Sequence, residues 1–393
     1  MCLFANIIII LVSYGGADQI ECHQVCSSFF FDYICGSMKK SAYIFLAVIV
    51  SLSACNSRVG NRTPGASCSY ASYFELLADS AVVAVSPFDG SRDTVKLNGA
   101  MNRIVCMSST HVACLSAIGA DSLIAAVSGV QYLAHVPYEG VPDIGYEAAL
   151  DYEKILDLHP DLLVTYVVSG AEPQYVTKLR SLGVPVLVLH DHLEDHPLAR
   201  AEYVRLFGAL TGRRHEADSV FGYVRDRYES LARSVSDRRR VKVLMNIPYA
   251  DAWYVPGAEN YMSRLIRDAS GEVLGAEPGV SRSKVISIEE AYGLSLNADI
   301  WLNPGYCRTR GQLKDVHQLF PSFGPLADGL PIYNNTLRTT PGGGNDFWES
   351  GAVRPDLILE DLIEVFHGDG SRNLNYYFSL EDQSEVVETV LAE

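Results

Sequence analysis

Aromatic and arginine side chains are concentrated in segments that follow short apolar runs of the chain. Aromatic rings suit flat macrocycles or catecholate rings, and arginine pairs with anionic groups such as carboxylates. For each aromatic taken alone, packing in the core is an equally good explanation, so the set is stronger than its members. The candidate ligand-binding residues are Ser108, Ser109, Thr110, Tyr132, Tyr146 and Tyr166 in the first half, and Tyr249, Trp253, Tyr254, Tyr306, Arg308, Arg338, Asp346, Phe347 and Trp348 in the second.

A second candidate for chemistry is the segment 190–196, which reads His-Asp-His-Leu-Glu-Asp-His. Imidazoles and carboxylates at this density are typical ligands of zinc or manganese. The segment follows the last apolar run of the first half and leads out of it. We therefore interpret it as a solvated hinge and expect no metal site.

The sequence carries no motif for catalysis or for binding nucleotide phosphates. The glycine-rich segment 340–348 lacks the Gly-Lys-Ser/Thr that places a lysine on phosphate, and no G-x-G-x-x-G follows an apolar run. Neither G-x-S-x-G nor H-E-x-x-H occurs. We expect no cofactor and no enzymatic activity.

The scaffold that must position these residues alternates short apolar runs with helical patterns, which predicts largely parallel sheets covered by helices. Residues 74–90, which precede the first lobe, predict a β-hairpin. In the first half the expected strands are 103–107, 123–127, 162–166 and 184–189, and the expected helices are 112–118, 151–158 and 173–182. Loops at the carboxyl ends of such strands would bring the candidate residues together.

An internal repeat predicts two similar lobes. Three pairs of segments match in the same order and at similar offsets. They are Arg103-Ile104-Val105 with Lys242-Val243-Leu244, the patterns that begin at Glu153 and Glu289, and Gly183-Val184-Pro185-Val186 with Gly329-Leu330-Pro331-Ile332. Between the lobes, residues 199–234 have apolar positions at helical spacing, which predicts two helices, the second a long and stiff connector.

The N-terminal region resembles a bacterial lipoprotein signal. Lys39 and Lys40 precede the apolar run 42–50, and Leu52-Ser53-Ala54-Cys55 ends it with small residues before a cysteine. By that resemblance Cys55 is lipidated. The alternative is an ordinary signal peptide with a chance cysteine, and residues 1–37 are either an over-extended start or an upstream anchor.

Composition limits the class of protein further. The 393 residues fit two domains, and 48% hydrophobic with 20% charged residues is normal for a globular chain. A net charge of −16 disfavours nucleic-acid binding. The nine cysteines include no C-x-x-C pair. We expect Cys106 and Cys114 to be buried thiols, with a disulfide between them as the alternative.

Several of these segments, in this order, resemble the class III solute-binding proteins of ABC importers, which carry cobalamin, haem or ferric siderophores. The resemblance covers residues 70–380. It is carried by residues 103–109, 160–164, the helical connector, and Arg354-Pro355-Asp356-Leu357-Ile358-Leu359. It implies two Rossmann-like lobes joined by a rigid helix, with a ligand cleft between them.

The resemblance also implies roles for particular residues. Members of this family dock on the permease through one exposed glutamate on each lobe, and the matching positions are Glu153 and Glu289. An acidic residue in the first turn of a helix is the plainer explanation. The expected organisation is 1–37 upstream segment, 38–55 lipoprotein signal, 56–69 tether, 70–195 N-terminal lobe, 196–236 helical connector, 237–380 C-terminal lobe and 381–393 tail.

The function expected from these features is capture of an iron chelate (siderophore or haem) or cobalamin for an ABC importer. The expected partners are the permease dimer with its ATPase subunits, the metal chelate, and a membrane reached through the lipid anchor, with an exported, periplasmic location. A free zinc- or manganese-binding protein and a chelatase-like enzyme on the same scaffold are the alternatives.

Overall fold

The computed structural model describes residues 68–78, 80–250 and 252–381. Every described residue belongs to one compact unit of the chain.

The expected signal and lipidation features fall elsewhere in the chain. The segments 1–37 and 38–55, the lipidation site Cys55, most of the expected tether and most of the expected tail lie outside the described residues. Within the described part, no helix is both long and apolar enough to cross a membrane.

The first lobe is built on four parallel strands in the order β5-β4-β6-β7. Their bounds are Ile104–Cys106 (β4), Ile124–Val127 (β5), Leu162–Tyr166 (β6) and Val186–Leu189 (β7), and the helices between them are Ser109–Ala117 (α4), Tyr152–Asp157 (α5) and Gln174–Ser181 (α6). Each expected strand and helix of this lobe is present, and no bound differs by more than three residues.

The strands of this sheet are buried on both faces, which explains their continuous apolar runs. Leu163 packs on one face with Ile155 of α5 and Leu179 of α6. Its neighbour Leu162 points to the opposite face and joins a larger core that continues into the second lobe.

A three-stranded antiparallel sheet precedes this lobe, in the order β1-β2-β3. Its strands are Phe74–Leu77 (β1), Ala81–Val85 (β2) and Arg92–Lys96 (β3). The predicted hairpin is present as β1 and β2, but the prediction missed β3. That strand alternates exposed polar and half-buried residues, so it has no apolar run to reveal it.

The second lobe has a five-stranded sheet in the order β10-β8-β12-β13-β14, parallel except for β14. The strands are Val241–Met245 (β8), Gly271–Val273 (β10), Ile300–Leu302 (β12), Ile332–Asn334 (β13) and Phe378–Ser379 (β14), and a separate antiparallel pair is formed by Trp253–Val255 (β9) and Lys284–Ile286 (β11). Its helices are Tyr261–Asp268 (α10), Ile288–Ser295 (α11), Arg310–Val316 (α12) and Gly324–Ala327 (α13).

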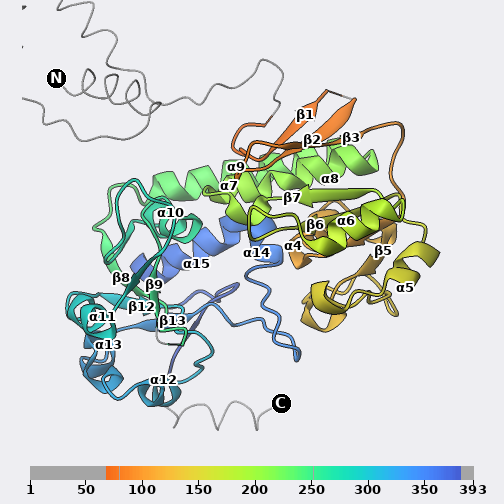
Figure 1. Ribbon diagram of the computed structural model, residues 1–393. Coiled ribbons are helices and arrows are strands. Elements are labelled where there is room, and N and C mark those ends of the chain that lie inside the picture. Colours follow the sequence, from red (N-terminus) through yellow and green to blue (C-terminus); the bar gives the residue numbers. More distant parts are fainter. Residues whose placement is uncertain (1–67, 79, 251, 382–393) are drawn as a thin grey trace, which may run out of the picture. The chain divides into compact units, whose positions relative to one another are not determined.

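Helices join the two lobes. The connecting helices are Pro197–Ala201 (α7), Tyr203–Thr211 (α8) and Arg214–Ser234 (α9), and the second lobe returns to them through Ser350–Val353 (α14) and Pro355–His367 (α15). Helix α9 is the long connector that the sequence predicts, and α15 packs along it (Figure 1). Arg227 of α9 donates to Asp356 at 2.8 Å and to Glu360 at 2.7 Å, which ties α9 to α15.

The internal repeat is confirmed by equivalent contacts in the two sheets. Asp161 accepts the backbone N–H of Arg103 at 3.1 Å, beside the start of β4, and Asp299 accepts that of Lys242 at 2.8 Å in β8. In each lobe the aspartate therefore fixes the backbone of the neighbouring strand. The two glycines that precede β7 and β13 in the repeat both have positive φ, which suits a residue without Cβ.

Candidate functional site

Most of the candidate aromatic residues lie at the carboxyl ends of the strands and are exposed. Their exposed fractions range from 40% for Tyr166 to 81% for Tyr249. Large hydrophobic side chains gathered in this way commonly mark a binding surface. The exposed members are Tyr132, Tyr146 and Tyr166 in the first lobe, and Tyr249, Tyr254, Tyr306 and Trp348 in the second.

A continuous series of contacts crosses from the first lobe to the second, and we call it the bridge. The rings of Tyr166 and His192 lie 5.6 Å apart, centroid to centroid. The carbonyl of His192 accepts a hydrogen bond of 2.6 Å from Arg200 of α7. The Arg200 guanidinium lies 4.0 Å above the ring of Tyr261, and Tyr261 lies 6.4 Å from Trp348. An exposed aromatic ring therefore stands at each end of the bridge, one on each lobe.

A second set of contacts joins the lobes, and we call it the clasp. It consists of residues 338–349 of the second lobe packed on residues 130–135 of the first. Glu349 accepts the backbone N–H groups of Ala134 and His135, both at 2.8 Å. Thr340 Oγ1 donates to the carbonyl of Gln131 at 2.8 Å.

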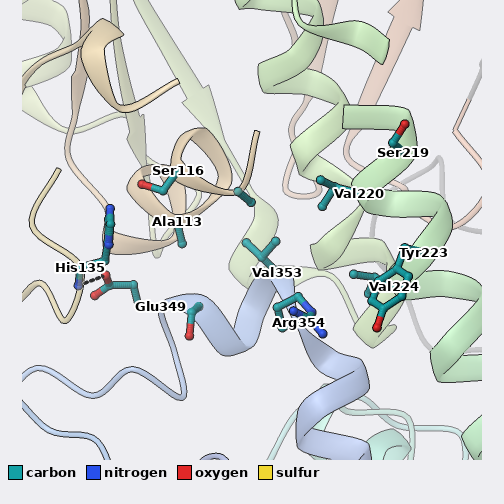
Figure 2. A pocket seen from close by; sticks show the side chains of 12 residues that line it. Ala113, Ser116, His135, Ser219, Val220, Tyr223, Val224, Glu349, Val353 and Arg354 are labelled. Carbon is teal, nitrogen blue, oxygen red and sulfur yellow. Dashed lines mark hydrogen bonds between the residues drawn. The ribbon is translucent and has the colours of Figure 1, made fainter. Parts of the chain in front are cut away.

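Two pockets flank the clasp. One, of about 550 Å³, lies between its two segments and is lined by residues 338–341 with Asp346 and by Val130, Gln131, Leu133, Ala134 and Val136. The other, of about 610 Å³, lies between the clasp, α4 and α9, and Figure 2 shows Glu349 and His135 on its wall. Two of the predicted ligand-binding residues, Arg338 and Asp346 of the second lobe, line the first pocket.

The two arginines of the candidate set are held in place by aromatic rings. Arg308 lies 4.7 Å above the ring of Phe378 and donates to the Thr336 carbonyl at 3.2 Å. Arg338 lies 4.4 Å above Tyr376 and pairs with Asp346 at 2.9 Å. Both guanidinium groups remain exposed. Their positions are therefore fixed while they remain able to pair with an anion.

Ser108, Ser109 and Thr110 form the turn that begins α4, and none of them is fully exposed. Ser108 Oγ caps the helix by accepting the N–H of Thr110. Thr110 Oγ1 donates to Asp191 at 2.9 Å. The hydroxyls of Ser108 and Thr110 therefore already have partners within the first lobe.

The interpretation of residues 190–196 as a solvated hinge is wrong. His190, Asp191 and Glu194 are buried, with exposed fractions of 4%, 6% and 2%. Asp191 lies 3.4 Å from His111 Nε2. Burial tends to raise the pKa of Asp191, but the nearby imidazoles of His111 and His192 and the Thr110 hydroxyl hold it well below its usual range.

Residues 190–196 pack beside the candidate residues, because the ring of His192 contacts that of Tyr166. Burial lowers the pKa of His192, which favours the neutral imidazole beside Tyr166. Across the described residues, no group of three or more histidine, cysteine, aspartate or glutamate side chains is arranged to hold a metal ion.

Two of the predicted ligand-binding residues belong to the core. Trp253 is 1% exposed and stacks on Trp301 and Phe323 at 6.0 and 5.8 Å. Phe347 is also 1% exposed and packs edge-on against Tyr376 and Tyr377. The prediction failed for these two because a ring in or near a loop can point inward as easily as outward.

The cysteines at positions 106 and 114 are free and buried. Burial raises the pKa of both thiols well above the usual range. The predicted buried thiols are confirmed, and the alternative disulfide is absent.

Glu153 and Glu289 occupy equivalent, exposed positions in the two lobes. Each lies in the first turn of a helix, α5 or α11, that leads into a central strand of its sheet. The capping contacts are made by other side chains, since Asp151 accepts the N–H of Lys154 and Ser287 that of Glu290.

Comparison with known proteins identifies the family. A family model described as periplasmic binding protein matches residues 104–314, which is more than half of the chain. The chain belongs to the periplasmic binding protein family. The expected resemblance to its class III members is confirmed, and so is the two-lobed α/β fold.

Similar proteins in this family span most of the chain. An uncharacterized lipoprotein of Methanocaldococcus jannaschii is 23% identical over 299 residues, which are 72% of this chain and 69% of that protein. A periplasmic binding protein of Veillonella parvula has a TM-score of 0.56 at 17% identity, covering 74% of this chain and 99% of that one.

A solved haem-binding protein of the family from Roseiflexus sp. has a TM-score of 0.53 at 20% identity, covering 70% of this chain and 100% of that one. Another, from Pseudomonas aeruginosa, has a TM-score of 0.53 at 19% identity, covering 71% and 98%. At these identities the two structures establish the shared fold.

The sequence did not single out three of the residues that join the lobes in this family member. Arg200 and Tyr261 lie in ordinary helical patterns, so nothing local marks them. Glu349 directly follows Phe347 and Trp348, and its place beside the candidate residues was the one available signal. His192 was considered only as a ligand of a bare metal ion.

Proposed function

We propose that this protein captures a metal chelate between its two lobes and delivers it to an ABC importer. The chelate is an iron complex (siderophore or haem) or a cobalamin. The observation that carries the proposal is the bridge from Tyr166 to Trp348, because it links an exposed aromatic ring of one lobe to an exposed ring of the other through His192, Arg200 and the buried Tyr261.

The chemistry of this surface fits a flat, anionic ligand. Aromatic faces contribute apolar area at low cost in conformational entropy, and a rigid ring can stack against a macrocycle or a catecholate. Arg308 and Arg338, positioned by Phe378 and Tyr376, supply positive charge for carboxylate or chelate oxygens. Tyr166, which is exposed, offers a phenol, a kind of group that ligates haem iron.

Delivery requires a second surface, for which we propose Glu153 and Glu289. Both carboxylates are exposed and occupy equivalent places in the two lobes. A pair of symmetric arginine clusters on a permease dimer would match them through charge-assisted hydrogen bonds. We also propose that the chain is exported and held at a membrane by a lipid on Cys55, so that the captured chelate stays near the importer.

The test is ligand binding by the full chain purified in a mild detergent. Haemin, cyanocobalamin, a ferric catecholate, a ferric hydroxamate and Zn²⁺ are titrated in turn, and binding is followed by the visible spectrum and by quenching of tryptophan fluorescence, with detergent alone as the blank. We expect one class of chelate to bind saturably. Trp253 and Trp301 are buried, so quenching by direct ligand contact should come from Trp348.

Single substitutions then locate the site. Tyr166→Ala and Trp348→Ala should each weaken binding by roughly tenfold, the effect of removing a well-packed aromatic contact. Tyr223→Ala is the matched control, since Tyr223 is an exposed aromatic of α9 on the pocket beside the connector. Equal losses in all three variants would contradict the site, and binding of Zn²⁺ alone would favour the free-metal alternative.

A further inference from the structure

We propose that Glu349 is a latch that sets the distance between the lobes and thereby positions the ligand-facing rings of Tyr132 and Trp348. The inference rests on the proposed function for its consequence in ligand binding. Its structural part, that this carboxylate holds the two lobes together, stands on the geometry of the clasp.

The carboxylate of Glu349 is well placed for this role. Its two oxygens accept the consecutive N–H groups of Ala134 and His135, each at 2.8 Å, across 215 and 214 residues of sequence. The side chain is 1% exposed, so water does not compete readily for these bonds. Hydrogen bonds to an ionised acceptor are about twice as strong as neutral ones.

Both ends of the latch are anchored within their own lobes. On the first lobe, His135 Nε2 lies 3.0 Å from Asp121, and Asp121 accepts the hydroxyl of Ser116 at 2.6 Å. On the second lobe, Glu349 begins α14, and the neighbouring Asp346 accepts the N–H of Ser350 and pairs with Arg338. Glu349 therefore joins two anchored segments, one in each lobe, and moving the lobes apart would break its hydrogen bonds.

The latch is adjacent in sequence to residues of the proposed ligand surface. Trp348 directly precedes Glu349, and Tyr132 precedes the accepted N–H groups by two and three residues. Fixing the Glu349 carboxylate on residues 134–135 therefore fixes the backbone that carries both rings. Preorganised contacts of this kind increase affinity by reducing the cost of ordering on binding.

The closeness of the two backbones shows that the clasp is tightly fitted. At Gly344 a β-carbon would collide with the carbonyl oxygen of Tyr132. Next to Glu349, in contrast, the pocket of about 610 Å³ leaves the clasp without tight packing toward α4 and α9 (Figure 2). On that side the hydrogen bonds of Glu349 act together with α14, which directly follows Glu349 and packs against α4.

The first measurement is hydrogen exchange at the backbone amides of Ala134 and His135, in the full chain without ligand. Glu349→Gln removes the charge and replaces one acceptor oxygen with a donor. Exchange at the two amides should accelerate by roughly tenfold or more. Glu202→Gln is the matched control, because Glu202 is also buried and accepts three backbone N–H groups at 69–71, away from the clasp.

The second measurement is affinity for whichever chelate the unmodified chain binds. Glu349→Gln should weaken it by roughly fivefold or more, and Glu202→Gln should leave it unchanged. Gly344→Ala tests the clasp by an independent route if Glu349→Gln folds poorly. The added methyl group should push the backbone of residue 344 away from that of Tyr132, and so speed exchange at Ala134 and His135 and weaken chelate binding.

The outcomes separate the latch from the proposed function. Unchanged exchange at Ala134 and His135 in both Glu349→Gln and Gly344→Ala overturns the latch. Faster exchange with unaltered affinity overturns its positioning role. If the unmodified chain binds no chelate, the proposed function fails, and faster exchange confined to these amides still supports a latch between the lobes.

Discussion

Replacing Glu194 by glutamine should change how the stability of the folded chain depends on pH. Glu194 is 2% exposed and accepts the N–H groups of Ser72 at 2.8 Å and Tyr73 at 2.9 Å, which holds the entering chain beside β1. Burial raises the pKa of its carboxyl from 4.5 to about 7, although the two N–H groups and the Tyr203 hydroxyl oppose the shift.

The sign follows from the direction of this shift. The folded chain binds the proton of Glu194 more tightly than the unfolded chain does, so its contribution to stability is fully present below about pH 4.5. That contribution is lost as the pH rises through about 7. At about 1.4 kcal/mol per pH unit, the shift corresponds to roughly 3 kcal/mol. Glutamine does not titrate, so Glu194→Gln lacks this dependence.

The assay is urea unfolding of both proteins from pH 4 to pH 8, followed by tryptophan fluorescence. The free energy of unfolding of the unmodified chain, minus that of Glu194→Gln, should fall by roughly 3 kcal/mol across this range, because other titrating groups cancel in the difference. A constant or rising difference would refute the reasoning. Glu75→Gln is a control, since Arg92 lowers the pKa of Glu75 and its contribution is lost only as the pH falls below about 4.5, so the corresponding difference should stay nearly constant from about pH 5 to pH 8.

Three further predictions concern the core, the importer and the membrane. Trp253→Ala should destabilise the chain by roughly 3 to 5 kcal/mol in urea unfolding, because it empties the stack on Trp301 and Phe323; a cost below about 1 kcal/mol would contradict this packing. Changing Glu153 and Glu289 together to alanine should leave chelate affinity intact and impair uptake in cells that carry the permease, whereas loss of binding would argue against a docking role. Cys55→Ala should release the protein from the membrane fraction, and unchanged retention would count against lipidation.

The sequence predicted the repeated parts of the fold well. The runs that begin at Arg103 and Lys242 match each other in the internal repeat, and each leads into a central strand of its sheet. Such strands are buried on both faces, so their continuous apolar pattern is distinctive. Strand β3 was missed because only one side of it is partly covered and its outward residues, Arg92, Thr94 and Lys96, are polar.

Predictions for individual site residues were less successful, for a physical reason. Tyr166 and Trp253 are both aromatic residues in or near a loop, yet one is 40% exposed and the other 1%. Local sequence does not specify on which side of the backbone a loop places its side chain. The charged residues of the segment 190–196 likewise suggested that it is exposed to solvent, whereas the fold buries Asp191 beside His111.

The sequence by itself determined two α/β lobes, a helical connector and equivalent places for Glu153 and Glu289, because each follows from periodicity and internal repetition. Tertiary structure alone decided the bridge and the clasp. Arg200 meets Tyr261, and Glu349 meets the Ala134 and His135 amides, across distant parts of the chain. Contacts of this kind depend on how the lobes pack together, and no local pattern of residues encodes that packing.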